Sequence, residues 1–250
     1  MANRRTDGGR QTKAERKEQA RRERLELQRT MARARRNRRI ALALVFVLVP
    51  GVVAAFVLTR PETVSATPGE LLRTAARAKQ AAGCGPVEDV GPFQPEGQDR
   101  AHPGADGLPP LSSFASIPPA SGPHGEVPLG AGVLGSPPPI DRLIHSLEHG
   151  AAIVWYAPDA DGEELDALRD FFRSPDVGSR VIVAPYAYPD QGAAGRLPAG
   201  TRMALVSWHH VQRCEQVSLA AAFDFTASYA APPFGERPYL GNAPEAGAAF

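Results

Sequence analysis

The stretch that decides the fold lies at residues 140–156 and reads IDRLIHSLEHGAAIVWY. Its first part has helical spacing, with apolar residues at i, i+3, i+4 and i+7. These apolar positions are Ile140, Leu143, Ile144 and Leu147. Gly150 closes the pattern, because a glycine readily takes the left-handed conformation that ends a helix. The apolar run Ala151–Tyr156 follows directly and is rich in strand-forming residues. We therefore expect a short amphipathic helix followed at once by a buried strand.

The polar residues of this helix gather on a neighbouring face. They are Asp141, His145, Glu148 and His149, at i, i+4, i+7 and i+8. Two imidazoles one turn apart, with a carboxylate beside them, can hold one metal ion. Asp141 would accept a hydrogen bond from the ring of His145 and orient it. This face is the candidate functional site.

A third imidazole comes from a loop that precedes the helix. His124 follows a segment, residues 118–123, that three prolines stiffen, so that holding its ring in one place loses less entropy. Imidazoles from two rigid elements suit Zn²⁺ or Cu²⁺. The candidate metal ligands are His124, His145 and His149, with His102 and Glu148 as further candidates. A structural cluster, in which the histidines only join loop to helix by hydrogen bonds, explains the same residues and stays open.

The same histidines also fit a catalytic pattern. His145-x-x-Glu148-His149 matches the H-x-x-E-H signature of inverted zincin peptidases. In that alternative Glu148 is the general base that acts on a zinc-bound water, and Glu215 is the candidate third ligand. The predicted helix stops directly after His149, which speaks against a metal-dependent hydrolase. Whether the protein is an enzyme therefore stays open, and the residues favour a non-enzymatic role.

Charge and hydropathy divide the chain sharply. Residues 1–39 carry 15 Lys/Arg against 5 Asp/Glu, whereas residues 60–250 carry 13 against 22. Residues 40–58 hold no charged side chain, and as a helix they would extend roughly 28 Å, close to the ~30 Å of a bilayer core. The basic flank of such a segment stays in the cytoplasm. We predict a single-pass transmembrane helix at 40–58 in the cell membrane, with an extracytoplasmic C-terminal part. A secretory signal peptide is the alternative, but no convincing small-residue cleavage site follows.

The composition of the basic tail 1–39 indicates what the tail binds. Lysine and arginine next to a membrane are attracted to anionic lipid headgroups, by about 1 kcal/mol for each charge near the surface. The tail holds no aromatic residue on which a base could stack, so we do not expect nucleic-acid binding. A tail that only sets the topology is the alternative. A protein of the cell envelope is the further partner that an extracytoplasmic domain would have.

The two cysteines, Cys84 and Cys214, both fall on the predicted outer side. In an oxidising compartment we expect them to form a disulfide, and two buried free thiols are the alternative. The sequence further predicts a linker at 59–67, an extracytoplasmic domain at 68–232 and a flexible tail at 233–250. Within the domain, Thr67 would cap a helix that runs to about Ala82.

The remaining elements give the fold class. Residues 86–139 hold 13 prolines and 9 glycines, and we expect an irregular, mostly ordered segment that wraps the core. Strands are predicted at 151–156, 180–185 and 201–209, and helices at 161–173, capped by Asp161, and at 218–229. The order β-α-β-β-α predicts a small α+β domain with a sheet of at least three strands. Its first two strands should be parallel, and the short link to the third suggests an antiparallel pair.

Two histidine motifs resemble a known family. They are PPASGPH at 118–124 and HSLEHG at 145–150, accompanied by AGC at 82–84 and by SW at 207–208. Together they resemble domain-of-unknown-function family 3105, over about residues 70–232. The resemblance implies a membrane-anchored or secreted bacterial protein and a grouping of the histidines. It implies no reaction.

Overall fold

The computed structural model describes Met31 and residues 66–103 and 107–250. The predicted transmembrane helix at 40–58 lies outside the described residues, as do nearly all of the basic tail and most of the predicted linker. In the part of the chain that the structure describes, no helix is both long and apolar enough to cross a membrane. The chain divides into two units, Met1–Glu62 and Thr63–Phe250, and the description below concerns the second.

The second unit is an α+β domain built on one six-stranded mixed sheet. Its helices are α2 (Pro68–Ala81), α3 (Ile140–Glu148), α4 (Glu163–Phe172), α5 (Pro175–Gly178) and α6 (Leu219–Tyr229), with 3-10 helices η2 (Leu111–Ser113) and η3 (Pro189–Gly195). Its strands are β1 (Glu88–Asp89), β2 (Gly132–Val133), β3 (Ala152–Tyr156), β4 (Val181–Pro185), β5 (Met203–Ser207) and β6 (His210–Cys214). The predicted α+β class is confirmed, and the sheet is larger than the three strands that the sequence indicated.

The sheet has the strand order β1-β6-β5-β3-β4-β2. The predicted parallel pairing of β3 with β4 is confirmed, and β2 adds a second parallel partner to β4. Strand β5 is antiparallel as expected, but it lies beside β3 rather than β4, because the other edge of β4 is taken by β2. Strands β6 and β1 extend the sheet with antiparallel pairs.

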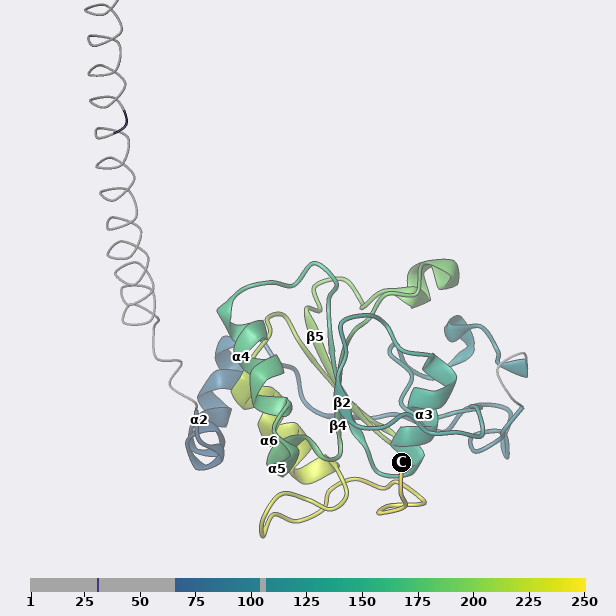
Figure 1. The fold of residues 1–250 in the computed structure, drawn as a ribbon. Helices are drawn as coiled ribbons and strands as arrows, with labels where there is room; N and C mark the ends of the chain where they lie inside the picture. Colours follow the sequence, from purple (N-terminus) through teal and green to yellow (C-terminus); the bar gives the residue numbers. More distant parts are fainter. Residues whose placement is uncertain (1–30, 32–65, 104–106) are drawn as a thin grey trace, which may run out of the picture. The chain divides into compact units, whose positions relative to one another are not determined.

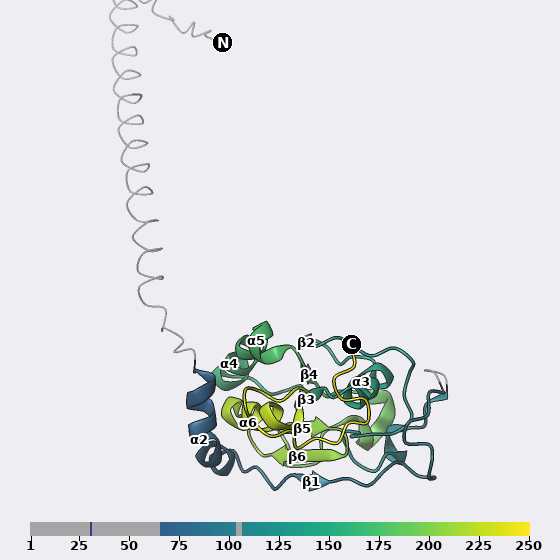
Figure 2. The same cartoon turned by 90° about the horizontal axis from the view of Figure 1, so that it is seen from below.

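The side chains of strand β3 alternate between two separate hydrophobic cores, one on each face of the sheet. Val154 lies in one apolar cluster, and Ile153 and Trp155 lie in the other, since neighbouring strand residues point to opposite faces. Helices α2, α4 and α6 cover the first face, and α3 covers the second (Figures 1 and 2). A strand buried on both faces explains the continuous apolar run that the sequence shows.

The second face is covered mainly by irregular chain. The described parts of segment 86–139 contribute Phe93, Leu111, Phe114 and Ala120 to this core. Where it is described, the segment is thus ordered and wraps the core, with β1, β2 and η2 as its short regular elements. Buried apolar side chains, rather than regular hydrogen-bond ladders, hold it on the sheet.

A disulfide ties α2 to the sheet. Cys84 follows α2 and is bonded to Cys214 at the end of β6, as predicted. Backbone hydrogen bonds flank it, from Gly85 N to Arg213 O (2.9 Å) and from Gln216 N to Ala82 O (3.0 Å). At the other end of α2, the Thr67 hydroxyl accepts the predicted capping bond from the amide of Glu70.

Two local predictions were wrong. Helix α4 has Gly162 rather than Asp161 at its N-cap, without a side-chain cap. The strand expected at 201–209 ends at Ser207, because a hairpin turn at Trp208–His209 leads into β6. His209 takes φ 63° there, in the left-handed region that sequence methods assign to glycine or asparagine.

The segment after α6 lies against the domain. Residues 233–250 were predicted to be a flexible tail, but the amides of Glu245 and Gly247 donate to the carbonyls of Glu148 and His149, over 3.0 and 3.2 Å. In both views the C-terminal end of the chain lies next to α3 (Figures 1 and 2). This segment therefore becomes part of the surroundings of the candidate site.

Candidate metal centre

Helix α3 and its C-cap residue supply three of the candidate residues. Its apolar face is fully buried in the second core through Leu143, Ile144 and Leu147, so the helix cannot rotate. His145 and Glu148, three residues apart, then project together from the adjacent face. The helix ends at Glu148, because Gly150 takes φ +91°. His149 is the C-cap residue.

The loop at residues 118–124, which three prolines stiffen, supplies His124. It pairs with the preceding segment through two backbone bonds, from Gly122 N to Asp99 O (3.1 Å) and from His124 N to Ala101 O (2.9 Å). A side chain at Gly122 would lie 2.7 Å from the Phe114 ring, and its φ is +127°, so only glycine fits this position. The pairing brings the stretch that carries Arg100 and His102 beside His124.

Four side chains converge where the loop meets α3. Each of His102, His124, His145 and Glu148 offers a ligand atom, and these atoms all lie within 4.8 Å of one another. His124 Nε2 lies 2.9 Å from Glu148 Oε2, and His102 Nε2 lies 3.7 Å from the same oxygen. The ring centroid of His145 is 4.9 Å from that of His124. Except for His102, whose side chain is 37% exposed, the group is buried.

The outer nitrogen of three rings is fixed by a backbone carbonyl. Nδ1 of His124 donates to Gly122 O (2.7 Å), and Nδ1 of His145 donates to Gly125 O (2.6 Å). Nδ1 of His149 donates to Ala249 O (2.7 Å). A carbonyl can only accept, so the proton of each neutral ring sits on Nδ1 and leaves the Nε2 lone pair free. This is the orientation that ligating histidines take.

The carboxylate of Glu148 is surrounded by positive and hydrogen-bonding groups. Its Oε2 contacts His124, and its Oε1 accepts a hydrogen bond from the guanidinium of Arg100. Burial opposes its ionisation, but these two partners prevail and hold the pKa of Glu148 at about 2. Glu148 is therefore an anion at neutral pH, inside a group of imidazoles.

His145 is neutral under the same conditions. Burial lowers its pKa below the ordinary value of 6.5, and although the bond to the Gly125 carbonyl opposes this, the neighbouring imidazoles of His124, His149 and His102 lower it further. A metal ion competes with a proton for Nε2, and a lowered pKa favours the metal.

The structure brings most of the predicted ligands together and rearranges their roles. His124, His145 and Glu148 meet, and so does His102, whose place in the sequence gave little sign of it. His149 lies outside the group of four, although its Nε2 is 3.0 Å from Nε2 of His145. The prediction that Asp141 orients His145 was wrong, because the carbonyl of Gly125 takes that position.

Two charged residues of the site were not predicted. Arg100 bonds Glu148 with one guanidinium nitrogen and Glu245 with another, the latter at 2.5 Å. Oε2 of Glu245 lies 3.3 Å from Nε2 of His149. Both residues come from irregular segments, where no periodic pattern marks which side chain points inward. Their only signal is their charge in a stretch otherwise rich in proline, glycine and alanine.

Two other histidines lie elsewhere. His209 bonds Asp99 through Nε2 (2.7 Å), and Nδ1 of His210 lies 2.8 Å from Asp89. Neither belongs to the group of four, but Asp99 directly precedes Arg100. Its carboxylate also accepts bonds from Phe93 N and from the Ser121 hydroxyl, so it fixes the start of the paired segment.

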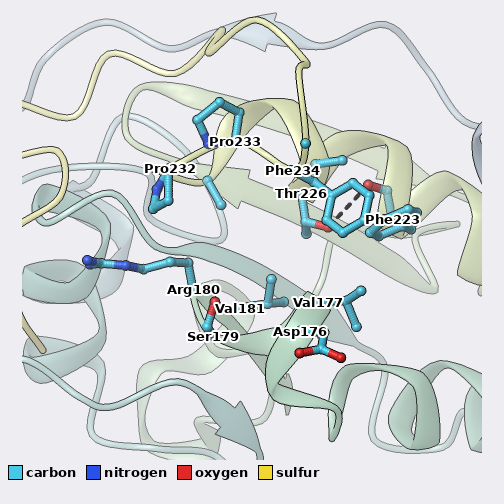
Figure 3. Close-up of a pocket in the computed structure, with 13 residues that line it drawn as sticks. Asp176, Val177, Ser179, Arg180, Val181, Phe223, Thr226, Pro232, Pro233 and Phe234 are labelled. Atoms are coloured by element: carbon cyan, nitrogen blue, oxygen red, sulfur yellow. Dashed lines mark hydrogen bonds between the residues drawn. The ribbon is translucent and has the colours of Figure 1, made fainter.

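A separate cavity of about 230 Å³ opens beside β4, α5 and α6 (Figure 3). Charged and polar residues such as Asp176, Arg180 and Thr226 share its wall with apolar ones such as Val181 and Phe223. None of the described residues that line it is a histidine, so it is distinct from the convergent histidines.

Comparison with known families agrees with the sequence motifs. Residues 112–245 match the family described as "Protein of unknown function (DUF3105)". The chain belongs to the DUF3105 family. The matched range of this DUF3105 domain includes His124, His145 and Glu148, whereas His102 lies before it. Neither a curated protein nor a solved structure matches the chain. The family supplies no reaction, so function rests on the geometry.

Proposed function

We propose that the DUF3105 domain binds one divalent transition-metal ion, Zn²⁺ or Cu²⁺, through His102, His124, His145 and Glu148. The observation that carries the proposal is the shared orientation of the buried rings. Carbonyls hold Nδ1 of His124 and His145, so both free Nε2 atoms face the site. Such fixed lone pairs beside a carboxylate are what a metal site needs.

The spacing of these acceptors also supports a cation. With metal–ligand bonds of about 2.0–2.1 Å, two ligands of one tetrahedral ion lie roughly 3.3 Å apart. His124 Nε2 and Glu148 Oε2 are separated by 2.9 Å, near that distance. Both atoms are acceptors when the ring is neutral. Only a proton or a metal ion between them removes the repulsion.

The donor set favours Zn²⁺ or Cu²⁺ over other ions. Imidazole suits these borderline metals, whereas Mg²⁺ and Ca²⁺ prefer all-oxygen sites. Thiolate ligation does not arise, since Cys84 and Cys214 are the only two cysteines of the chain and are joined in the disulfide. A partly exposed His102 leaves one side through which an ion can enter.

The geometry favours binding over the hydrolase alternative. A general base must be free to take a proton from a metal-bound water. One oxygen of Glu148 already accepts a hydrogen bond from Arg100, and the other lies 2.9 Å from Nε2 of His124, among the proposed ligand atoms. Glu215, the candidate third ligand, lies against Gly83 beside the disulfide. Glu148 thus either binds the ion itself or holds the ring of His124 that binds it.

Metal analysis of the purified full-length chain tests the proposal. After loading with zinc or copper and exhaustive dialysis, we expect about one ion per chain in the wild type and none in His145→Ala. His210→Gln is the matched control, because it removes a histidine that lies outside the site. Wild-type protein that retains no metal under these conditions would leave only the structural alternative, in which protons bridge the acceptor pairs.

We further propose that the chain is a single-pass protein of the cell membrane, with its domain outside the cytoplasm. The uncharged residues 40–58 and the basic tail before them support this, and so does the disulfide, which persists in oxidising compartments. Protease added to intact cells should digest the domain and spare the tail. Recovery of the whole chain in the soluble fraction would overturn the proposal. Binding of the tail to anionic, but not neutral, vesicles would identify lipid as its partner.

A further inference from the structure

His102 differs from the other three members of the group in how its side chain is held. The rings of His124 and His145 are buried, and each donates from Nδ1 to a backbone carbonyl. The carboxylate of Glu148 is buried as well and accepts a bond from Arg100. In contrast, no described residue forms a hydrogen bond with the ring of His102, whose Nε2 lies 3.7 Å from Glu148 Oε2. Three ligands are therefore fixed before a metal binds, and the fourth is not.

The backbone and the packing of His102 show the same difference. His145 and Glu148 project from helix α3, whose apolar face is fixed in the core. Residues 99–103, in contrast, form neither a helix nor a strand. The ring of His102 meets the group edge-on, with its centroid 4.4 Å from that of His124 and 5.1 Å from that of His145. Because such edge contacts are weak, the ring can leave without disturbing the three buried ligands.

This division matches the metal sites that keep one position open. Zinc sites of the open type have three protein ligands, and their fourth position is left to an outside molecule. A side chain that is not held in advance must lose rotamer freedom when it binds, so it is the ligand most easily replaced. We infer that His102 is a displaceable ligand, and that the metal centre offers its fourth position to an external ligand. This inference rests on the proposed metal binding.

Charge points to a small anion as the external ligand. Glu148 and Glu245 carry two negative charges, and Arg100 and a divalent ion together carry three positive ones. A centre with neutral rings therefore keeps one positive charge in excess. His102 leaves this excess in place, whereas an anion cancels it. The guanidinium of Arg100 is half-exposed and lies on the same segment as His102, so it attracts an anion to this side of the site.

Titration of the cobalt-loaded full-length chain with azide tests the inference. Co²⁺ takes nitrogen and oxygen ligands as Zn²⁺ does, and its visible absorption changes with the ligand set. Azide, a small anion, should change the wild-type spectrum and reach saturation. His102→Ala should still bind one ion per chain and should bind azide roughly tenfold more tightly, as expected for a ring that occupies the position about nine-tenths of the time. His210→Gln, which changes a histidine outside the site, should bind azide as the wild type does.

The outcomes separate the inference from the proposed function. If the wild type binds cobalt but azide leaves its spectrum unchanged, the inference is overturned and the metal centre stands. The same follows if His102→Ala loses the ion as His145→Ala does, or binds azide no more tightly than the wild type. Tighter binding of imidazole, a neutral probe, than of azide would overturn the assignment to an anion. If the wild type binds no metal, the metal centre itself fails. The wild-type titration holds even if the variant does not fold.

Discussion

The two faces of the sheet are built in different ways. The face under α2, α4 and α6 is covered by regular helices, which pack aliphatic and aromatic side chains against it. The opposite face is covered by one short helix and by irregular chain, and the convergent histidines lie there. The first face provides stability through apolar packing, whereas the second positions polar groups. Changes on the two faces should therefore have separable effects.

The largest loss of stability is expected on the helix-covered face. Phe172 of α4 is buried, at 2% exposure, and Phe172→Ala should destabilise the domain by about 3–5 kcal/mol through the lost contacts and the cavity left behind. Zinc affinity should be unchanged while the protein stays folded. His145→Ala should instead lose zinc binding and keep most of the stability of the domain. Urea denaturation and zinc titration of both variants check the separation, and equal losses of zinc affinity would contradict it.

Removal of the disulfide comes next. Cys84 and Cys214 are 130 residues apart, and the link restricts the unfolded chain. The double change to serine should lower the free energy of unfolding by about 2–5 kcal/mol. Cys214 belongs to the core of the helix-covered face, so metal binding should persist below the lowered melting temperature. Loss of metal binding in a folded double variant would show that the two faces are coupled.

Acid should act on the histidine-bearing face through Glu148. Its pKa is about 2 in the folded domain against 4.5 for a free side chain, so ionised Glu148 stabilises the fold above pH 4.5. This contribution is lost as pH falls from 4.5 towards 2. Glu148→Gln, which cannot ionise, should show a weaker decline in that window. Urea denaturation at several pH values measures it, with Glu236→Gln as the exposed control. Parallel curves for wild type and Glu148→Gln would refute the assignment.

A smaller effect is expected at Asp99, which holds the start of the segment that carries Arg100 and His102. Its carboxylate accepts bonds from Phe93, Ser121 and His209. Asp99→Asn should weaken zinc binding a few-fold, because it loosens the ligands without removing one. Asp159→Asn changes an exposed partner of Arg202 and should have no effect on zinc. A zinc affinity unchanged in Asp99→Asn would show that the segment is held by its backbone alone.

The same contrast governs what the sequence could predict. Helix α2 follows from its cap and α3 from its apolar periodicity, whereas strands β3 and β4 follow from short continuous apolar runs. Strands β1 and β2 have only two residues each and carry no period. Strand β6 was missed because His209 forms its turn without glycine.

The site divides in the same way. His145 and Glu148 were identified because a helix fixes their spacing, and His124 because prolines mark its loop. Arg100 and Glu245 were missed, since they lie 145 residues apart in irregular segments that only the tertiary fold brings together. The backbone acceptors, such as the Gly125 carbonyl, have no signature in a sequence at all.

X-ray absorption spectroscopy of the zinc-loaded full-length chain tests the central claim most directly, because it reports the atoms around the ion. We expect nitrogen and oxygen neighbours at about 2.0–2.1 Å, with outer-shell scattering from three imidazoles. His145→Ala, if it retains zinc at high concentration, should lose one of them. A shell of oxygen atoms without imidazole scattering would contradict convergence of the histidines on a metal ion.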